Sequence, residues 1–76
     1  MYDFIVNPLS RSGQEHSIWK TVETELKKEN ITYEVHFTAH RRHATSIAEE
    51  ITKDGKEHTL IVLGGDGTIN EVINGI

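Results

Sequence analysis

An unbroken apolar run that ends in a cluster of glycines is the feature that most restricts the fold of this 76-residue chain. The run covers residues 59–63, TLIVL, and Gly64, Gly65, Asp66 and Gly67 follow it directly. A short apolar run of this kind is typical of a buried parallel strand, because helices cover both faces of a parallel sheet. We therefore predict a central parallel strand that ends in a glycine turn.

Two further strands precede this run. Residues 2–6, YDFIV, are rich in β-branched and aromatic side chains and end before Pro8, and residues 32–38, TYEVHFT, alternate between apolar and polar positions. Each of these predicted strands is followed by a segment with helical spacing. We therefore expect the three strands to be joined by helices.

Apolar side chains at helical spacing predict these helices. The first helix is expected over about residues 15–29, ending at Asn30, and the second ends near Gly55. The order strand, helix, strand, helix, strand predicts an α/β fold, a three-layer, partial Rossmann-like parallel sheet within a single domain of residues 1–76. The apolar positions are Ile18, Val22 and Leu26 in the first helix, and Ala44, Ile47, Ala48 and Ile51 in the second. Trp19, beside the first stripe, is expected to be a partly buried core residue.

A third helical stripe runs to the end of the chain. Ile69, Val72, Ile73 and Ile76 are spaced i, i+3, i+4 and i+7. Three strands and these helices would leave apolar surface bare, which a parallel sheet normally does not do. We therefore expect the chain to be the first part of a longer protein, and we expect self-association of the isolated piece.

Charge and composition restrict the partners and the compartment. The net charge of −4 argues against broad attraction to nucleic acid, and the lack of cysteine fits a reducing compartment. No leader sequence is recognisable, and no stretch approaches the roughly 18 apolar residues that span a bilayer. We expect a cytoplasmic protein that binds no nucleic acid.

Ligands of such sheets bind outside the carboxyl ends of the strands, and all three loops there carry candidate residues. The glycine turn lets the backbone approach a ligand closely, and the amides after it begin a helix whose positive dipole end faces outward. This pattern predicts an anion site. Neither the P-loop motif nor the dinucleotide fingerprint fits, because the lysine of the first is missing and Asn70 replaces the last glycine of the second. The candidates are Asn7, Ser10, Arg11, Ser12 and Gly13 in the first loop, Thr38 and the cluster His40–His43 in the second, and Gly64, Gly65, Asp66, Gly67 and Thr68 in the third.

Asp66 is the unusual residue of the glycine turn, since a carboxylate repels phosphate. It can be accommodated by a divalent cation, directly or through water, by a role as proton acceptor, or by capping the N–H of Ile69 in a purely structural turn with positive φ. The cluster His40–His43, HRRH, can face phosphates or anionic lipid headgroups, or be a polar loop before a helix. His40 and His43 alone supply too few ligands for zinc.

Three segments taken together carry a resemblance to a known family. GGDGTINEVINGI after an apolar strand, VNPLSRSG after the first strand and a threonine that ends the second strand ahead of HA resemble the N-terminal part of the diacylglycerol kinase catalytic domain family. This family includes bacterial lipid kinases and the sphingosine and ceramide kinases. Arg11 and Gln14 differ from the glycine and the basic residue that many members carry there.

The resemblance implies ATP and Mg²⁺ as cofactors. By it, Asn7 and residues 10–13 would line the nucleotide pocket, Thr38 would contact a phosphate or sugar, and residues 65–71 would surround the ATP phosphates. Asp66 would belong to the magnesium and water network, and Asn70 and Glu71 would point toward the site from the first helical turn.

The function implied by the resemblance is transfer of the γ-phosphoryl group of ATP to a diacylglycerol-like lipid hydroxyl, with transient contact at a membrane surface. The catalytic base and the lipid pocket are expected in a C-terminal, mainly β domain outside this chain, so the 76 residues alone should have no turnover. Three alternatives stay open: an NAD kinase-like or sugar-phosphate kinase nucleotide domain, a non-catalytic nucleotide-binding module, and a scaffold piece that folds by associating with itself.

Overall fold

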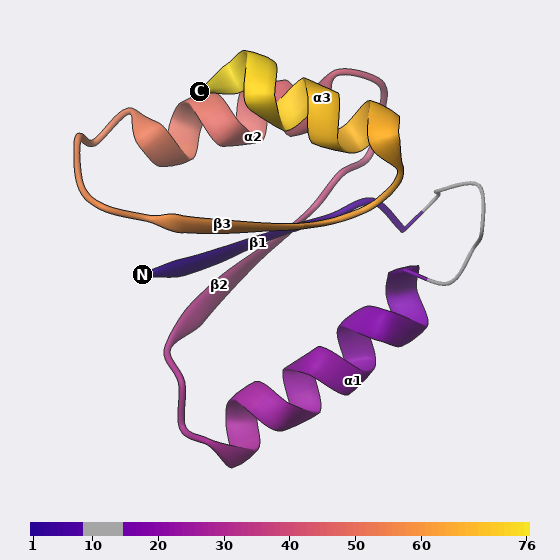
Figure 1. Ribbon diagram of the computed structural model, residues 1–76, viewed down its shortest axis with the longest axis vertical. Helices are drawn as coiled ribbons and strands as arrows, with labels where there is room; N and C mark the ends of the chain where they lie inside the picture. The colour runs from indigo at the N-terminus through magenta and orange to yellow at the C-terminus, as the bar shows by residue number, and fades with distance from the viewer. Residues whose placement is uncertain (9–14) are drawn as a thin grey trace.

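The computed structural model describes residues 1–8 and 15–76, and in them strands and helices alternate along the chain (Figure 1). All three strands are parallel and lie in one sheet with the order β2-β1-β3. The predicted α/β class is therefore confirmed. The elements are β1 (Tyr2–Val6), α1 (Glu15–Lys28), β2 (Tyr33–Phe37), α2 (His43–Thr52), β3 (Thr59–Leu63) and α3 (Asp66–Gly75).

The sheet lies between two helical layers, as predicted. In Figure 1, α1 covers one face, whereas α2 and α3 lie side by side over the other. The prediction that residues 59–63 form the central strand is wrong for the described sheet, because β1 lies between its two neighbours. The apolar run of β3 nonetheless packs on both faces, since Leu60 and Val62 contact one core and Ile61 and Leu63 the other.

Side chains of the central strand alternate between two hydrophobic cores. Ile5 packs with Ala44, Ala48 and Val72 under α2 and α3, where it is completely buried. Phe4 and Val6 pack with Trp19 under α1, and the rings of Phe4 and Trp19 lie 5.1 Å apart. Because β1 contributes to both cores, it is the element around which the two layers are assembled.

The buried stripe of α1 differs from the predicted one by a single position. Trp19 is 2% exposed, with Val22 and Leu26 packed beside it, whereas Ile18 is 45% exposed. The indole covers more of the sheet than an isoleucine could, and its rotation into the core turns Ile18 outward. The predicted helix ends are confirmed, because Asn30 (φ 56°) and Gly55 (φ 71°) have the left-handed backbone that stops a helix.

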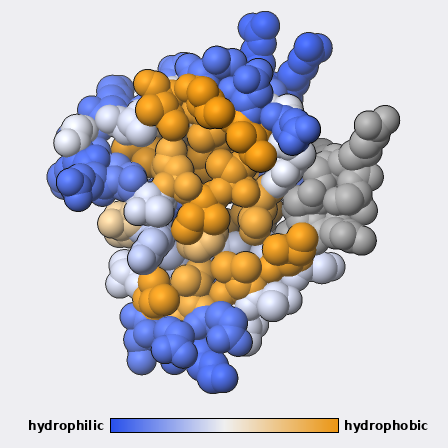
Figure 2. All heavy atoms as spheres, in the orientation of Figure 1, coloured by the Kyte–Doolittle hydropathy of each residue, from blue (hydrophilic) through white to orange (hydrophobic). Residues whose placement is uncertain are grey.

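A hydrophobic area covers much of the face toward β3 and α3, as Figure 2 shows. The exposed isoleucines of α3 and its C-cap, which we call the apolar face, are Ile69, Ile73 and Ile76, with exposed fractions of 42%, 62% and 74%. This exposed area agrees with the expectation that the helices leave apolar surface bare. Among residues 1–8 and 15–76, no helix has the length and apolar character needed to cross a bilayer.

Candidate functional site

A small pocket lies at the carboxyl ends of β1 and β2, beside the first turn of α3. Its volume is about 190 Å³. Hydrogen bonds extend the sheet into the loops that form it: Asn7 N–H donates to the carbonyl of Leu63, and Thr38 N–H donates to the carbonyl of Val6, both at 2.9 Å. The lining residues are Asn7, Thr38, Ala39, His40, Arg41, Ala44, Thr68 and Glu71.

Four of the predicted site residues, Asn7, Thr38, Thr68 and Glu71, are brought together in this pocket. The amide of Asn7 donates a 3.0 Å hydrogen bond from Nδ2 to Oγ1 of Thr68, across 61 positions of sequence. This bond fixes the start of α3 against the end of β1. Ser10, Arg11, Ser12 and Gly13 lie outside the described residues.

The glycines of the turn fall into two kinds. A Cβ at Gly64 would lie 2.8 Å from the side chain of Thr68, so Gly64 is required by packing. A Cβ at Gly65 or Gly67 would meet nothing within 4 Å. Neither residue has a positive φ, and Gly65 is extended (φ −81°, ψ −178°), so the predicted positive-φ turn is wrong. Neither packing nor backbone conformation therefore calls for glycine at positions 65 and 67.

Asp66 is the first residue of α3, not a cap that precedes it. Gly65 is the N-cap, and its carbonyl accepts the N–H of Ile69 at 3.2 Å. The interpretation in which the Asp66 side chain caps Ile69 is therefore wrong. The carboxylate is exposed in the first helical turn, where the helix dipole favours a negative charge.

Glu71 links α3 to the start of α2. Its Oε2 accepts a 3.2 Å hydrogen bond from the backbone N–H of Arg42, and its carbonyl accepts a 2.7 Å bond from the hydroxyl of Thr45. A carboxylate at the positive end of α2 is electrostatically favourable. Glu71 therefore has a structural role in addition to lining the pocket, whereas Asn70 is exposed and does not line it.

The basic cluster supplies two of the pocket residues, His40 and Arg41, which were candidates in the second loop, whereas Ala39 and Ala44 on either side of the cluster were not predicted to line the site. The rings of His40 and His43 stack at 4.5 Å, and Nδ1 of His43 accepts the N–H of Ala39 at 2.7 Å. The sequence indicated these loop residues only by their position, because they follow the carboxyl end of a predicted strand. The stacked pair shapes the loop and directs one histidine and one arginine to the pocket.

Comparisons with known proteins show which family and fold the chain resembles. Residues 2–76 match the diacylglycerol kinase catalytic domain. The chain is 37% identical over 75 residues to the Bacillus subtilis protein named "Putative lipid kinase YtlR", covering 96% of this chain and 24% of that protein. It is 33% identical over 72 residues to mouse ceramide kinase, covering 93% of this chain and 13% of that enzyme.

A solved structure has the same fold as this chain. It is described as "A putative diacylglycerol kinase from Bacillus anthracis str. Sterne" and matches with a TM-score of 0.80 and 29% identity, over 99% of this chain and 26% of that one. The chain thus spans about a quarter of the length of its bacterial relatives.

Proposed function

Because this chain belongs to the diacylglycerol kinase catalytic domain family, we propose that it is the ATP-binding portion of a lipid kinase. The complete enzyme would transfer the γ-phosphoryl group of ATP to a lipid hydroxyl of the diacylglycerol type. Phosphoryl transfer depends on positioning and on electrostatic stabilisation of phosphate oxygens, so a turn that offers backbone amides suits one part of that task.

The observation that carries this proposal is the open space around Gly65 and Gly67. Gly67 lies inside α3, where alanine would stabilise a helix by up to about 0.5–1 kcal/mol relative to glycine. Both positions would accept a Cβ without a clash. A ligand that approaches the backbone closely gives a reason for glycine there, and the outward N–H groups of a helix start suit phosphate.

The residues around the turn also fit the cofactors. Asn7, Thr38, His40 and Arg41 border the pocket and supply hydrogen-bond donors and cationic groups for a phosphate or a ribose. Exposed Asp66 would bind Mg²⁺ through water, and the bound ion would neutralise charge on the phosphates. The base that accepts the lipid proton and the lipid pocket would lie outside these 76 residues, so the isolated chain should bind without turnover.

The proposal is tested by calorimetric titration of the intact protein with ATP and Mg²⁺, together with a phosphorylation assay on vesicles that contain diacylglycerol. Gly67→Ala should keep or raise the thermal stability while it lowers ATP affinity by tenfold or more, because a methyl group would occupy the space of the phosphate. Asn74→Ala, at an exposed position on the same helix, is the matched control: it also replaces a poorer helix former with alanine, but it should leave ATP affinity unchanged.

Two results would contradict the proposal. Unchanged ATP affinity in Gly67→Ala would show that phosphate does not approach this turn. Tight ATP binding without phosphorylation of any lipid by the intact protein would instead favour a non-catalytic nucleotide-binding module. We expect the enzyme in the cytoplasm, in transient contact with the membrane surface where its substrate lies.

A further inference from the structure

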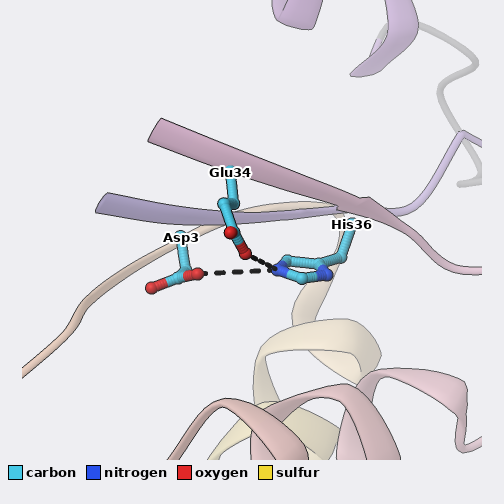
Figure 3. A group of neighbouring side chains, drawn as sticks. All are labelled: Asp3, Glu34 and His36. Carbon is cyan, nitrogen blue, oxygen red and sulfur yellow. Dashed lines mark ion pairs between the residues drawn. The ribbon is translucent and has the colours of Figure 1, made fainter. Parts of the chain in front are cut away.

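A second group of polar side chains lies at the opposite end of the strands from the glycine turn. Asp3, Glu34 and His36 project from the first half of β1 and from β2 toward the helical layer of α2 and α3 (Figure 3). Asp3 and Glu34 are paired in the sheet register, so the backbone itself places them side by side. The proposed phosphate site does not use any of these three residues.

Asp3 is a charged residue in the interior, 2% exposed. One of its oxygens has a partner: Oδ2 accepts a 2.6 Å hydrogen bond from Nδ1 of His58, and Nε2 of His58 lies 3.0 Å and 3.1 Å from the two oxygens of Asp54. This chain of hydrogen bonds holds the Asp3 carboxylate in one orientation. Its other oxygen, Oδ1, is directed toward His36 (Figure 3).

His36 has a buried ring nitrogen that faces two carboxylates without a hydrogen bond to either. Nε2 lacks a hydrogen-bond partner among the described residues, although it lies 3.5 Å from Oδ1 of Asp3 and 3.9 Å from Oε2 of Glu34. A buried polar atom without a partner costs free energy, so such an atom requires an explanation.

The spacing of these atoms supplies an explanation for the unbonded nitrogen. Two ligands of a tetrahedral zinc ion, each about 2.0–2.1 Å from the metal, are about 3.3 Å apart. The separations of 3.5 Å and 3.9 Å exceed a good hydrogen bond and are close to this value. One nitrogen and two carboxylate oxygens, all within 4.8 Å of one another, therefore need only small side-chain movements to converge on one ion.

The surroundings favour a cation. The pocket at this position has a volume of about 390 Å³ and has one lysine, Lys56, and the two histidines as its basic residues. Its size leaves room for a water molecule as a further ligand, and the 61% exposed side chain of Glu34 lies on its open side. Its carboxylates are those of Asp3, Glu34, Glu50, Asp54 and Glu57.

We propose that Oδ1 of Asp3, Oε2 of Glu34 and Nε2 of His36 bind one divalent transition-metal ion of the Zn²⁺ class, with water in the fourth position. The imidazole ligand favours such an ion over Mg²⁺ or Ca²⁺, which prefer oxygen ligands alone. The ion ties β1 to β2, and His58 is a positioning residue that orients Asp3 through its second oxygen. The site stabilises the fold and is independent of ATP.

The test uses the intact protein, stripped of metal with a chelator and titrated with Zn²⁺ against a fluorescent zinc indicator. One Zn²⁺ should bind in addition to any ion bound elsewhere, and Co²⁺ in its place should give the intense visible absorption of a tetrahedral complex. His36→Ala and Glu34→Gln should each weaken this binding by tenfold or more, and His58→Ala should weaken it by about 10–100-fold. Zn²⁺ should raise the melting temperature of the wild type but not that of His36→Ala.

Two controls make the result specific. Glu25→Gln, an exposed carboxylate on α1, is matched to Glu34→Gln and should bind Zn²⁺ as the wild type does. The double variant His40→Ala/His43→Ala removes the stacked pair and should also leave this binding intact. Absence of Zn²⁺ and Co²⁺ binding, binding equal in wild type, His36→Ala and Glu34→Gln, or loss of binding in the His40/His43 variant would each overturn the proposal. Glu34→Gln, at an exposed side chain, keeps the test valid even where His36→Ala fails to fold.

Discussion

At the scale of single residues, the five glycines within residues 1–8 and 15–76 differ in how much space surrounds them, and only the structure separates them. A Cβ on Gly75 would collide with the backbone carbonyl of Thr45, where α3 crosses α2, whereas the surroundings of Gly67 are open. Gly75→Ala should therefore lower the free energy of unfolding by about 1–3 kcal/mol, because a helix backbone cannot move aside cheaply. Urea denaturation of the intact protein measures this, with Gly67→Ala as the control that should lose no stability. Equal stability of Gly75→Ala and wild type would contradict the close crossing.

The Asn7–Thr68 hydrogen bond joins the end of the first strand to the last helix. The interaction energy between the two side chains can be measured directly by changing each residue alone and both together. Both side chains are largely shielded from solvent, so removal of either one breaks a hydrogen bond that water does not readily replace. We expect Asn7→Ala and Thr68→Val each to cost about 1–3 kcal/mol of unfolding free energy. The double variant should cost less than the sum, with an interaction of about 0.5–1.5 kcal/mol. Strict additivity in urea denaturation would show that the bond contributes nothing.

At the scale of elements, two adjacent residues of α1 show what could be predicted and what could not. Spacing predicted an amphipathic helix and identified Val22 and Leu26 on its buried side, but it placed Ile18 within the buried stripe and Trp19 only beside it, as a partly buried core residue. Hydrophobic spacing is ambiguous where neighbouring residues are both apolar, and the choice depends on the shape of the sheet surface. Trp19→Ala should destabilise the protein by about 3–5 kcal/mol, while Ile18→Ala should change stability by less than about 1 kcal/mol. Thermal or urea unfolding measures both variants. A larger loss of stability in Ile18→Ala than in Trp19→Ala would contradict this assignment.

The candidate site was predictable to the extent that chain order determines it. The carboxyl ends of parallel strands meet at one edge of a sheet, which brought Asn7, Thr38 and Thr68 together as expected. The backbone angles of the turn and the hydrogen bond from Arg42 to Glu71 depend on how α3 packs against α2, and no local pattern encodes that. The cluster of Asp3, Glu34 and His36 was missed entirely, although an aspartate inside an apolar strand is an unusual residue whose partners only the sheet register reveals.

His58 connects the loop before β3 to the start of β1, and this connection should make stability depend on pH. Its hydrogen bond to Asp3, and then that to Asp54, raises the pKa of His58 above its ordinary value of 6.5. A raised pKa in the folded state means that the stabilisation is complete below the unfolded pKa and is lost as pH rises through the folded pKa. In chelator, the melting temperature should therefore fall as the pH rises from the unfolded-state pKa of His58 through its higher folded-state pKa. His58→Asn should flatten this slope and His40→Asn should not; a slope unaffected by His58→Asn would contradict the assignment.

At the scale of the whole molecule, the apolar face of Ile69, Ile73 and Ile76 should determine how the isolated 76-residue chain behaves. These side chains are spaced four and three positions apart on one side of α3 and its C-cap, and each is more than 40% exposed. Contiguous apolar surface of this kind drives association when no other part of a protein covers it. Sedimentation of the isolated chain should therefore show concentration-dependent self-association.

A charge placed within the apolar face should abolish that association. Ile73→Lys puts an ammonium group at a position that is 62% exposed, so it disturbs the folded chain little but must be desolvated in any interface. Ile31→Lys, at a 38% exposed isoleucine in the loop before β2, is the matched control and should associate as the wild type does. A monomeric wild type, or equal association of Ile73→Lys and Ile31→Lys, would show that the apolar face does not drive association of the chain. Within a polypeptide as long as the bacterial relatives, of which this chain spans about a quarter, the same Ile73→Lys change should lower stability, because further residues would be available to cover this surface.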